Sequence, residues 1–301
     1  MMMYWPPLAP PVSSPVCDGT GSARAVQAGA DLHVHTTHSD GVFSPGEVLR
    51  SAAQAGLAAV AITDHDTVSG VSVAQPEANR LGIELIPGIE MTAEHAGHEV
   101  HILGYFLDVH DEALLEATQR FRLERDQRLL SMIDALRELG LLVDFQAIRT
   151  VWPRAALGRK HLAEWLVKSQ QAPTVRVAFD RYLADDAPAC RPRPRIPWSE
   201  AVACIARARG VAALAHPGRK LADPLLLDMK AAGLAGIEVN WPGQGANRVR
   251  QARERADRLG LIPLSGSDFH APDQSMRSIG CRVTPVAELE RLRACASTPA
   301  R

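Results

Sequence analysis

The sequence predicts an α/β fold in which a barrel of alternating strands and helices carries a helical insertion. Three observations support this prediction. Short apolar runs bounded by Gly or Pro alternate with amphipathic segments from residue 30 onward. This alternation stops between about residues 108 and 198, where helical patterns predominate. Finally, residue types that bind metals stand at or beside most of the expected strands, as at the mouth of a barrel.

Length and composition agree with a folded chain of this class. The 301 residues are 46% hydrophobic, which is enough to bury a full core. Lys and Arg (33) nearly balance Asp and Glu (34), which argues against binding of long nucleic acid through bulk positive charge. The five cysteines are scattered and never form Cys-x-x-Cys, so neither a disulfide framework nor a thiolate zinc site is indicated. A reducing cytoplasm fits this cysteine usage.

The first 29 residues are expected to form a flexible tail. They lack a basic segment of the kind that begins a signal peptide, and their prolines interrupt any apolar run. The sequence therefore predicts neither a secretory signal nor a membrane span here.

The expected strands are short, apolar and bounded by Gly or Pro. Besides the opening stretch at 31–41, they are residues 58–66, 82–91, 98–106, 210–218, 236–240 and 260–270. A helix is predicted after the first strand, because Ser44 is a suitable N-cap, Pro45 suits the first helical position and Glu47 follows the cap by three residues. Gly56 is expected to end this helix.

The insertion interrupts the barrel, which we expect to consist of residues 30–107 and 199–301. Residues 108–198 contain one long charged amphipathic helix and two shorter helical segments, at 111–140, 158–169 and 174–185. The proline-rich stretch 188–198 is expected to return the chain to the barrel.

The stretch "DLHVHTTHSDG" at 31–41 points to a metal site. On a strand, His33 and His35 face the same way, about 7 Å apart. The later strands that bear metal-binding residue types are each expected to finish in them, and in a barrel such strand ends gather at one face. These residues are Asp64, His65, Glu90, His101, His216, Asp268 and His270. Imidazole and carboxylate ligands without thiolates suit manganese, iron or zinc, so the sequence predicts a divalent metal centre.

The motifs "DLHVHTTHSDG", "AITDHDTVSG", "PGIEMTAE", "EVHILGYF", "AHPG" and "GSDFH" together resemble the PHP (polymerase and histidinol phosphatase) family of the amidohydrolase-like superfamily. The resemblance runs from residue 30 to about 285. It implies a distorted (β/α)7 TIM-like barrel with a helical cap. Within the family, the chain is similar to the stand-alone branch that includes 3',5'-nucleotide bisphosphate phosphatases and 5'-to-3' exoribonucleases, because "GRKHLAEWLV" and "FDRYLADDAPACRPRP" resemble that branch's cap segments.

The resemblance also implies three metal ions, with manganese favoured over iron or zinc. The first would bind His33, His35, Glu90 and Asp268. The second would bind Glu90, His101 and His216. The third would bind Asp40, His65 and His270. A hydroxide bridging the first two ions, held by Glu90, His33, His35, Asp268, His101 and His216, would attack phosphorus.

The activity implied by the resemblance is hydrolysis of the 3'-phosphate of 3',5'-nucleotide bisphosphates, together with trimming of short 5'-phosphorylated RNA from the 5' end. Arg159 and His161 lie in the cap-like segment and are expected to bind the second phosphate, with Arg125 of the long helix as a further candidate. Alternatives are a histidinol-phosphatase-like or other small-molecule phosphomonoesterase, an amidohydrolase, and a non-catalytic scaffold. Asp40 argues against the histidinol phosphatases, some of which have histidine at this position.

Several neighbouring residues are expected to have other roles. His38 would face away from His33 and His35 if the strand continued to it. Asp64 and Asp66 are expected to orient His65 or the adjacent turn, since metal-bound imidazoles usually donate their other N–H to a hydrogen-bond acceptor.

Overall fold

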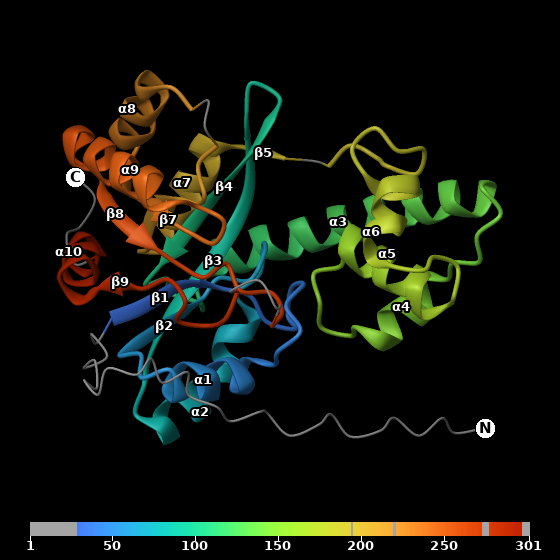
Figure 1. Ribbon diagram of the computed structural model, residues 1–301, viewed down its shortest axis with the longest axis horizontal. Coiled ribbons are helices and arrows are strands. Elements are labelled where there is room, and N and C mark those ends of the chain that lie inside the picture. The colour runs from blue at the N-terminus through green and yellow to red at the C-terminus, as the bar shows by residue number, and fades with distance from the viewer. Residues whose placement is uncertain (1–28, 194, 219–220, 273–276, 297–301) are drawn as a thin grey trace.

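The computed structural model describes residues 29–193, 195–218, 221–272 and 277–296 (Figure 1). The expectation of a flexible tail falls on residues 1–28, outside the described residues. The strands are β1 (Gly29–Val34), β2 (Ala59–Ile62), β3 (Glu84–His95), β4 (His98–Tyr105), β5 (Ile196–Pro197), β6 (Val211–Leu214), β7 (Leu234–Asn240), β8 (Ile262–Ser265) and β9 (Thr284–Pro285). The helices are α1 (Pro45–Gln54), α2 (Ser69–Leu81), α3 (Glu112–Glu138), α4 (Phe145–Val151), α5 (Arg159–Lys168), α6 (Val175–Ala178), the π-helical turn η1 (Phe179–Leu183), α7 (Trp198–Arg207), α8 (Asp223–Ala231), α9 (Ala246–Leu259) and α10 (Val286–Ala296).

The strands form a nearly closed barrel, as the sequence predicts. Their order is β8-β7-β6-β4-β3-β2-β1-β9, with β5 paired to β3. Backbone hydrogen bonds join the segment after β8 to the end of β1, where His35 N donates to Phe269 O at 2.9 Å and Phe269 N donates to His33 O at 3.4 Å. The two ends of the sheet therefore meet beside the "DLHVH" stretch.

Strand β4 departs from the alternation of a regular barrel. It runs antiparallel to both β3 and β6, whereas β1, β2 and β3 are parallel. The reason is local, because β3 and β4 are joined by only Ala96 and Gly97, whose φ angles are +49° and +80°. Two successive positive φ angles form the tight turn that reverses the chain in a hairpin and leaves no room for a crossover helix.

Helix α1 begins as its sequence predicts. The Ser44 side chain accepts a hydrogen bond from Glu47 N, and the Glu47 side chain accepts one from Ser44 N, so the predicted capping box is formed. Pro45 is the first helical residue. The helix ends at Gln54, and Gly56 adopts a φ of +71° just beyond it.

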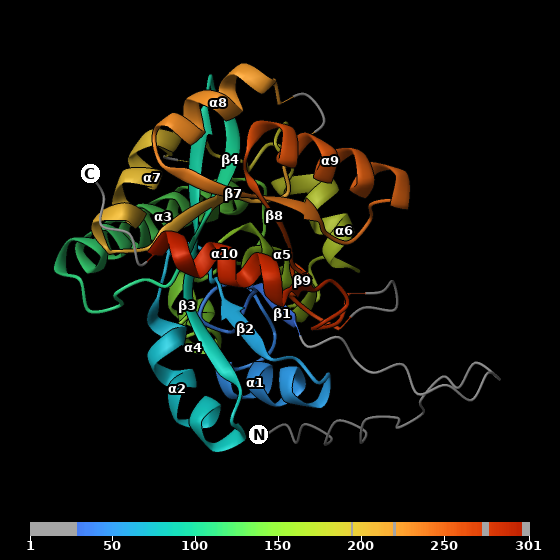
Figure 2. The ribbon, with the colours of Figure 1, turned by 90° about the vertical axis from the view of Figure 1, so that its left-hand side faces the viewer.

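Helices surround the barrel and cover one of its ends (Figure 2). One apolar cluster takes residues from strands all round the sheet and two leucines from α10: Leu32, Ala61, Ile86, Leu103, Ala213, Leu264, Leu289 and Leu292. Residues from opposite sides of a barrel can meet only in its interior. Helix α10 therefore packs on the filled end of the barrel, and the opposite end faces the helices of the insertion (Figure 1).

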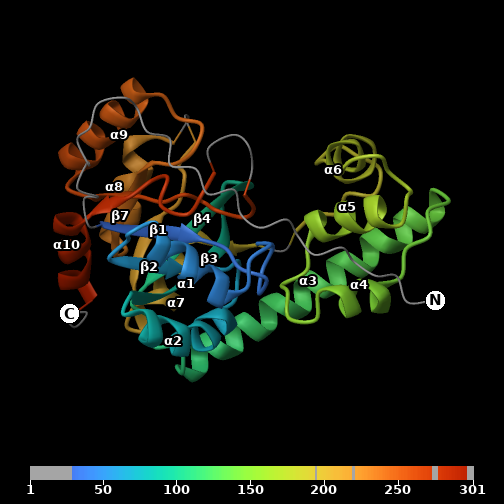
Figure 3. The same ribbon diagram turned by 60° about the horizontal axis from the view of Figure 1, so that its bottom comes forward.

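The insertion forms a helical cap, which we define as residues 112–193. Helix α3 packs near its start against α7, and its second half carries α4, α5 and α6 (Figure 3). The cap has its own apolar core, which includes Leu129, Met132, Ile133, Leu136, Ile148, Leu162 and Leu166. Polar contacts join it to the barrel mouth, where Ala156 N donates to His38 O at 2.9 Å and Lys160 Nζ donates to Asp40 O.

Within the described part of the chain, no helix combines the length and the apolar character needed to cross a membrane.

Two adjacent leucines of α3 provide a test of the cap core. Leu129 is 2% exposed and Leu130 is 42% exposed. We expect Leu129→Ala to lower the free energy of unfolding by about 2–5 kcal/mol, through lost burial and the cavity left behind. The matched variant Leu130→Ala should change it by less than about 1 kcal/mol. Urea denaturation followed by circular dichroism measures both values, and equal losses would contradict this packing of α3.

Candidate metal centre

The nine metal-ligand candidates converge at the barrel mouth. His33 lies on β1, while His35 and Asp40 follow it in the next loop. The others are distributed over five further strands or the loops after them: His65 after β2, Glu90 within β3, His101 within β4, His216 after β6, and Asp268 and His270 after β8. Residues from more than 230 positions of sequence thus meet at one face.

His101 reaches the mouth differently from its expected placement at a strand end. It is the fourth residue of β4, opposite Thr92 of β3. Because β4 runs antiparallel to its neighbours, its first half points toward the mouth where the parallel strands end. The expectation that each strand finishes at the site is therefore wrong for β4, and also for β3, which continues for five residues beyond Glu90.

The carboxylate of Glu90 lies at the middle of the site and is fully buried. Its two oxygens lie between 2.8 and 3.3 Å from nitrogen atoms of five imidazoles: His33, His35, His65, His101 and His216. The Oε1 atom faces His101 and His216, and the Oε2 atom faces the other three. A carboxylate shared in this way can bridge two ions.

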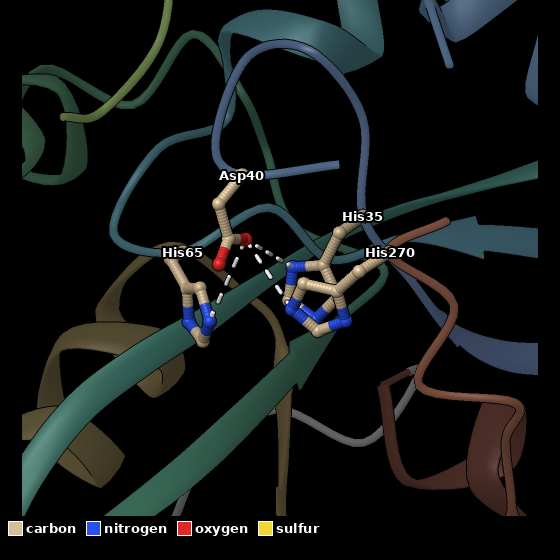
Figure 4. Close-up of side chains that lie close together, drawn as sticks. All are labelled: His35, Asp40, His65 and His270. Atoms are coloured by element: carbon tan, nitrogen blue, oxygen red, sulfur yellow. Dashed lines mark ion pairs between the residues drawn. The ribbon is translucent and has the colours of Figure 1, made fainter. Parts of the chain in front are cut away.

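Two further carboxylates complete the cluster. The Oδ1 atom of Asp40 lies 3.3 Å from His270 Nε2, 3.9 Å from His65 Nε2 and 4.0 Å from His35 Nδ1 (Figure 4). The Oδ1 atom of Asp268 lies 3.5 Å from His33 Nε2 and from His35 Nε2. The donor atoms fall into four overlapping groups, within each of which all atoms lie within 4.8 Å of one another.

Five buried nitrogen and oxygen atoms of this cluster, all able to bind a metal, have no hydrogen-bond partner among the described residues. They are His33 Nε2, His35 Nε2, Asp40 Oδ1, His65 Nδ1 and Glu90 Oε2. Buried polar atoms are almost always hydrogen-bonded, and these lie close together without hydrogen-bond geometry. Nitrogen and oxygen atoms that lie this close together without hydrogen bonds are suited to bind divalent cations. Because the set contains no sulfur, it suits manganese, iron or zinc.

The charges of the cluster depend on mutual contacts. Burial acts to raise the pKa of Glu90, but the imidazoles of His65, His101 and His33 outweigh it and hold that pKa well below its usual range. Burial acts to lower the pKa of His33, but the carboxylates of Glu90, Glu238 and Asp268 outweigh this effect and hold that pKa well above its usual value. The pKa of His65 is lowered to about 4, mainly by burial. Glu90 is therefore ionised, as a metal ligand must be.

Two glutamates that the sequence analysis missed support the imidazoles. The Oε1 atom of Glu238 lies 3.2 Å from His33 Nδ1, and its Oε2 atom accepts a hydrogen bond from His216 N at 2.7 Å. Glu99 Oε1 lies 3.0 Å from His101 Nε2. Such carboxylates set the tautomer and orientation of metal-binding histidines. A charged residue within the apolar run "GIEVN" is the signal that could have revealed Glu238.

The backbone at the site is unusually constrained. His216 and Asp268 have φ angles of +22° and +47°, which non-glycine residues rarely adopt. Gly266 passes so close to β1 that a Cβ atom placed on it would lie 2.3 Å from His33 Cβ. Strain of this kind is characteristic of functional sites.

The loop after β1 is held by the carboxylate of Asp64. The carboxylate of Asp64 accepts hydrogen bonds from Thr36 N, Thr36 Oγ1 and Ser39 Oγ, each at 2.7 Å. His38 lies in a turn, because β1 ends at Val34, so the expected alternation of strand faces does not extend to it. Its ring is buried and its Nδ1 atom lies 2.7 Å from Ser69 Oγ.

The cap residues expected to bind substrate are engaged in protein contacts. Arg159 Nη1 lies 2.5 Å from Asp185 Oδ1, and the Arg159 side chain is 28% exposed. His161 is 2% exposed, and its Nδ1 atom accepts a hydrogen bond from Gly158 N at the start of α5. Arg125 pairs with Asp66 of the barrel at 2.6 Å. All three residues belong to the cap that faces the mouth, and their contact with substrate stays a prediction.

A cavity of about 450 Å³ opens beside the centre. His101 and His216 form part of its wall, together with the apolar residues Val100, Leu214, Ala215, Pro217, Leu221 and Leu225. Its volume is within the range of small-molecule sites. The cavity therefore borders the centre on the side of these two histidines.

A barrel with this ligand set at its mouth defines a metal-dependent hydrolase. The PHP domain matches residues 31–187. A 3',5'-nucleoside bisphosphate phosphatase of Chromobacterium violaceum is 36% identical over 84% of this chain and 91% of its own length. The chain belongs to the PHP family and is a metal-dependent phosphoesterase.

Other relatives agree with this class. A 5'-3' exoribonuclease of Haemophilus influenzae is 32% identical over 80% of this chain and 90% of its own length. A solved structure from Bifidobacterium adolescentis, described as a candidate metal-dependent phosphoesterase, superposes with a TM-score of 0.81 at 28% identity, covering 89% of this chain and 96% of that one.

Replacement of Glu90 tests the metal centre directly. Glu90→Gln keeps the shape of the side chain but removes the charge that faces five imidazoles. We expect it to bind manganese at least about a hundredfold more weakly, since even hydrogen-bond partners of ligands are worth about 10–100-fold in affinity. Elemental analysis and calorimetric titration measure the effect. Glu84→Gln, at the exposed start of the same strand, is the matched control, and equal metal binding by the wild type and Glu90→Gln would refute the assignment.

Proposed function

We propose that the protein hydrolyses the 3'-phosphate of 3',5'-nucleotide bisphosphates. The observation that carries this proposal is the metal centre, where buried nitrogen and oxygen atoms without hydrogen-bond partners lie close together. The chain that forms this centre is 36% identical to a 3',5'-nucleoside bisphosphate phosphatase. The nine ligands are assigned as the family resemblance implies, with His33, His35, Glu90 and Asp268 in one set. His101 and His216 share Glu90 in the second, and Asp40, His65 and His270 form the third.

The roles of the protein's own side chains follow from their contacts. Divalent ions, manganese first among them, would activate a water molecule and neutralise phosphoryl oxygens when bound. Glu90 supplies shared negative charge between the ligand sets. Glu238 and Glu99 hold the rings of His33 and His101 in one orientation, so that the donor atoms are positioned before substrate arrives.

Small substrates fit this arrangement better than long nucleic acids. The cap faces the mouth (Figure 1), and the near balance of acidic and basic residues provides little bulk attraction for a long polyanion. Arg159, His161 and Arg125 are proposed to bind the second phosphate from the cap. Arginine suits this role because its planar fork can bind two phosphate oxygens at once.

A second candidate activity is trimming of short 5'-phosphorylated RNA from its 5' end. The Haemophilus influenzae exoribonuclease, at 32% identity over most of both chains, favours it. Both activities need the same metal centre and differ in what the cap accepts beyond the reacting phosphate.

A substrate panel tests the proposal. We expect phosphate release from 3',5'-adenosine bisphosphate with a higher kcat/KM than from p-nitrophenyl phosphate or histidinol phosphate. Chelation should abolish this activity and manganese should restore it, because the ions activate the attacking water. A 5'-phosphorylated RNA trimer in the same assay distinguishes the second candidate. Hydrolysis of an amide panel without phosphate release would refute both.

Arg159 tests the substrate role of the cap. We expect Arg159→Ala to lower kcat/KM for 3',5'-adenosine bisphosphate by about ten- to a hundredfold, as for a lost hydrogen bond to a charged group worth about 1.5–3 kcal/mol. Hydrolysis of p-nitrophenyl phosphate, which has no second phosphate, should barely change. Arg176→Ala, with a side chain 90% exposed on α6, is the control. Equal losses on the two substrates would assign Arg159 to the fold.

A further inference from the structure

We propose that Asp66 is a positioning residue that sets where the cap's arginines stand relative to the metal centre. The proposal rests on the proposed function, because it concerns how the second phosphate of a bisphosphate is bound. It is carried by a junction of three side chains, in which one carboxylate of the barrel meets Arg125 and Arg193 of the cap.

The junction is buried and closely bonded. Asp66 is 5% exposed, and its Oδ2 atom accepts hydrogen bonds from Arg125 Nε at 2.9 Å, Arg125 Nη2 at 2.6 Å and Arg193 Nη2 at 2.6 Å. The two arginine side chains are 11% and 14% exposed. Buried charges of this kind are costly without a partner, so each arginine depends on Asp66 for its position.

The same carboxylate is joined to the backbone of the metal centre. Its Oδ1 atom accepts a hydrogen bond from Thr92 N at 2.7 Å, and Asp66 N donates to Glu90 O at 2.9 Å. Asp66 also follows His65 directly and adopts a φ of +54°. Asp66, which holds the cap, is thus bonded directly to two metal-ligand candidates: to His65 through the peptide bond and to Glu90 through a backbone hydrogen bond.

On the cap side, the junction leads to the proposed phosphate-binding residues. A Cβ atom placed on Gly158 would lie 3.5 Å from Arg125 Nη1, and Gly158 is followed by Arg159 at the start of α5. Two guanidinium groups share the one carboxylate of Asp66, while Glu99 and Arg128 act on Arg193 with opposite signs. Burial lowers the pKa of Arg193 to about 10, so its side chain stays charged at neutral pH. The junction thus fixes the distance between the metal centre and the start of α5, where Arg159 stands.

Asp66→Asn tests the proposal, because asparagine can still accept from Thr92 N but lacks the charge that holds the arginines. We expect KM for 3',5'-adenosine bisphosphate to rise at least about tenfold, with kcat changed less than about threefold, as for loss of a charged hydrogen bond. Hydrolysis of p-nitrophenyl phosphate and bound manganese should stay near wild-type levels. Hydrogen exchange at residues 191–193 and along α3 near Arg125 should become faster.

Matched variants keep the test decisive. Asp126→Asn breaks an ion pair of 2.5 Å with Arg149 inside the cap and should reproduce none of these effects. Arg193→Gln removes the charge from the cap side and should reproduce the rise in KM, even if Asp66→Asn folds poorly. Equal losses on both substrates, or loss of manganese, would show that Asp66 acts on the metal centre and would overturn the proposal. So would unchanged KM and exchange in both variants.

If the proposed function is wrong, the kinetic and hydrogen-exchange results differ from those expected if only the role of Asp66 is wrong. If the wild-type protein does not hydrolyse the bisphosphate, the assignment of substrate fails, and the exchange measurements decide the junction. Faster exchange in Asp66→Asn but not in Asp126→Asn would then support Asp66 as the residue that holds the cap, and equal exchange would refute it.

Discussion

The burial of Glu90 is the constraint on which the rest of the structure depends. A carboxylate removed from water is costly unless cations or hydrogen-bond donors surround it. Here nitrogen atoms of five imidazoles lie within 3.3 Å of Glu90, but its Oε2 atom has no hydrogen-bond partner among the described residues, so bound cations would have to compensate its charge. These imidazoles come from four strands or their following loops besides β3 itself. A sheet that closes on itself is one architecture that brings so many strands around a single point. The closure between His35 and Phe269, the hairpin that turns β4, and the strained backbone at His216 all serve this arrangement.

Local parts of this structure could be predicted from sequence because their causes are local. The capping box of α1 depends on Ser44 and Glu47, three residues apart, and the apolar periods of the barrel depend on near neighbours. The ligand residues could be recognised because imidazoles and carboxylates recur beside apolar runs. Other features depend on partners remote in sequence. Asp66 bonds to Arg125 and Arg193, 59 and 127 residues away, and no spacing rule connects them.

The errors have equally physical causes. The strand-end placement of His101 follows from the regular alternation of a (β/α) barrel, whereas the two-residue turn at Ala96 and Gly97 reverses β4. The expected facing of His38 depends on a strand that ends four residues earlier, at Val34. Glu238 stands out as a charged residue in an apolar strand, but the strand's sequence does not indicate which residue it contacts. Its importance appears only when β7 is placed beside His33.

Helix α3 gives the molecule a mechanical property. Its 27 residues correspond to about 40 Å at 1.5 Å per residue. The helix packs against α7 near its start, and the other helices of the cap pack along its second half. A small tilt of such a long helix would therefore produce a larger displacement at its far end. A tilt of about 5° at the barrel end displaces the far end by roughly 3–4 Å, comparable to the length of one hydrogen bond. The contacts of the cap with Asp66, His38 and Asp40 at the barrel mouth oppose such a tilt, so the distance between the cap and the metal centre depends on these few bonds.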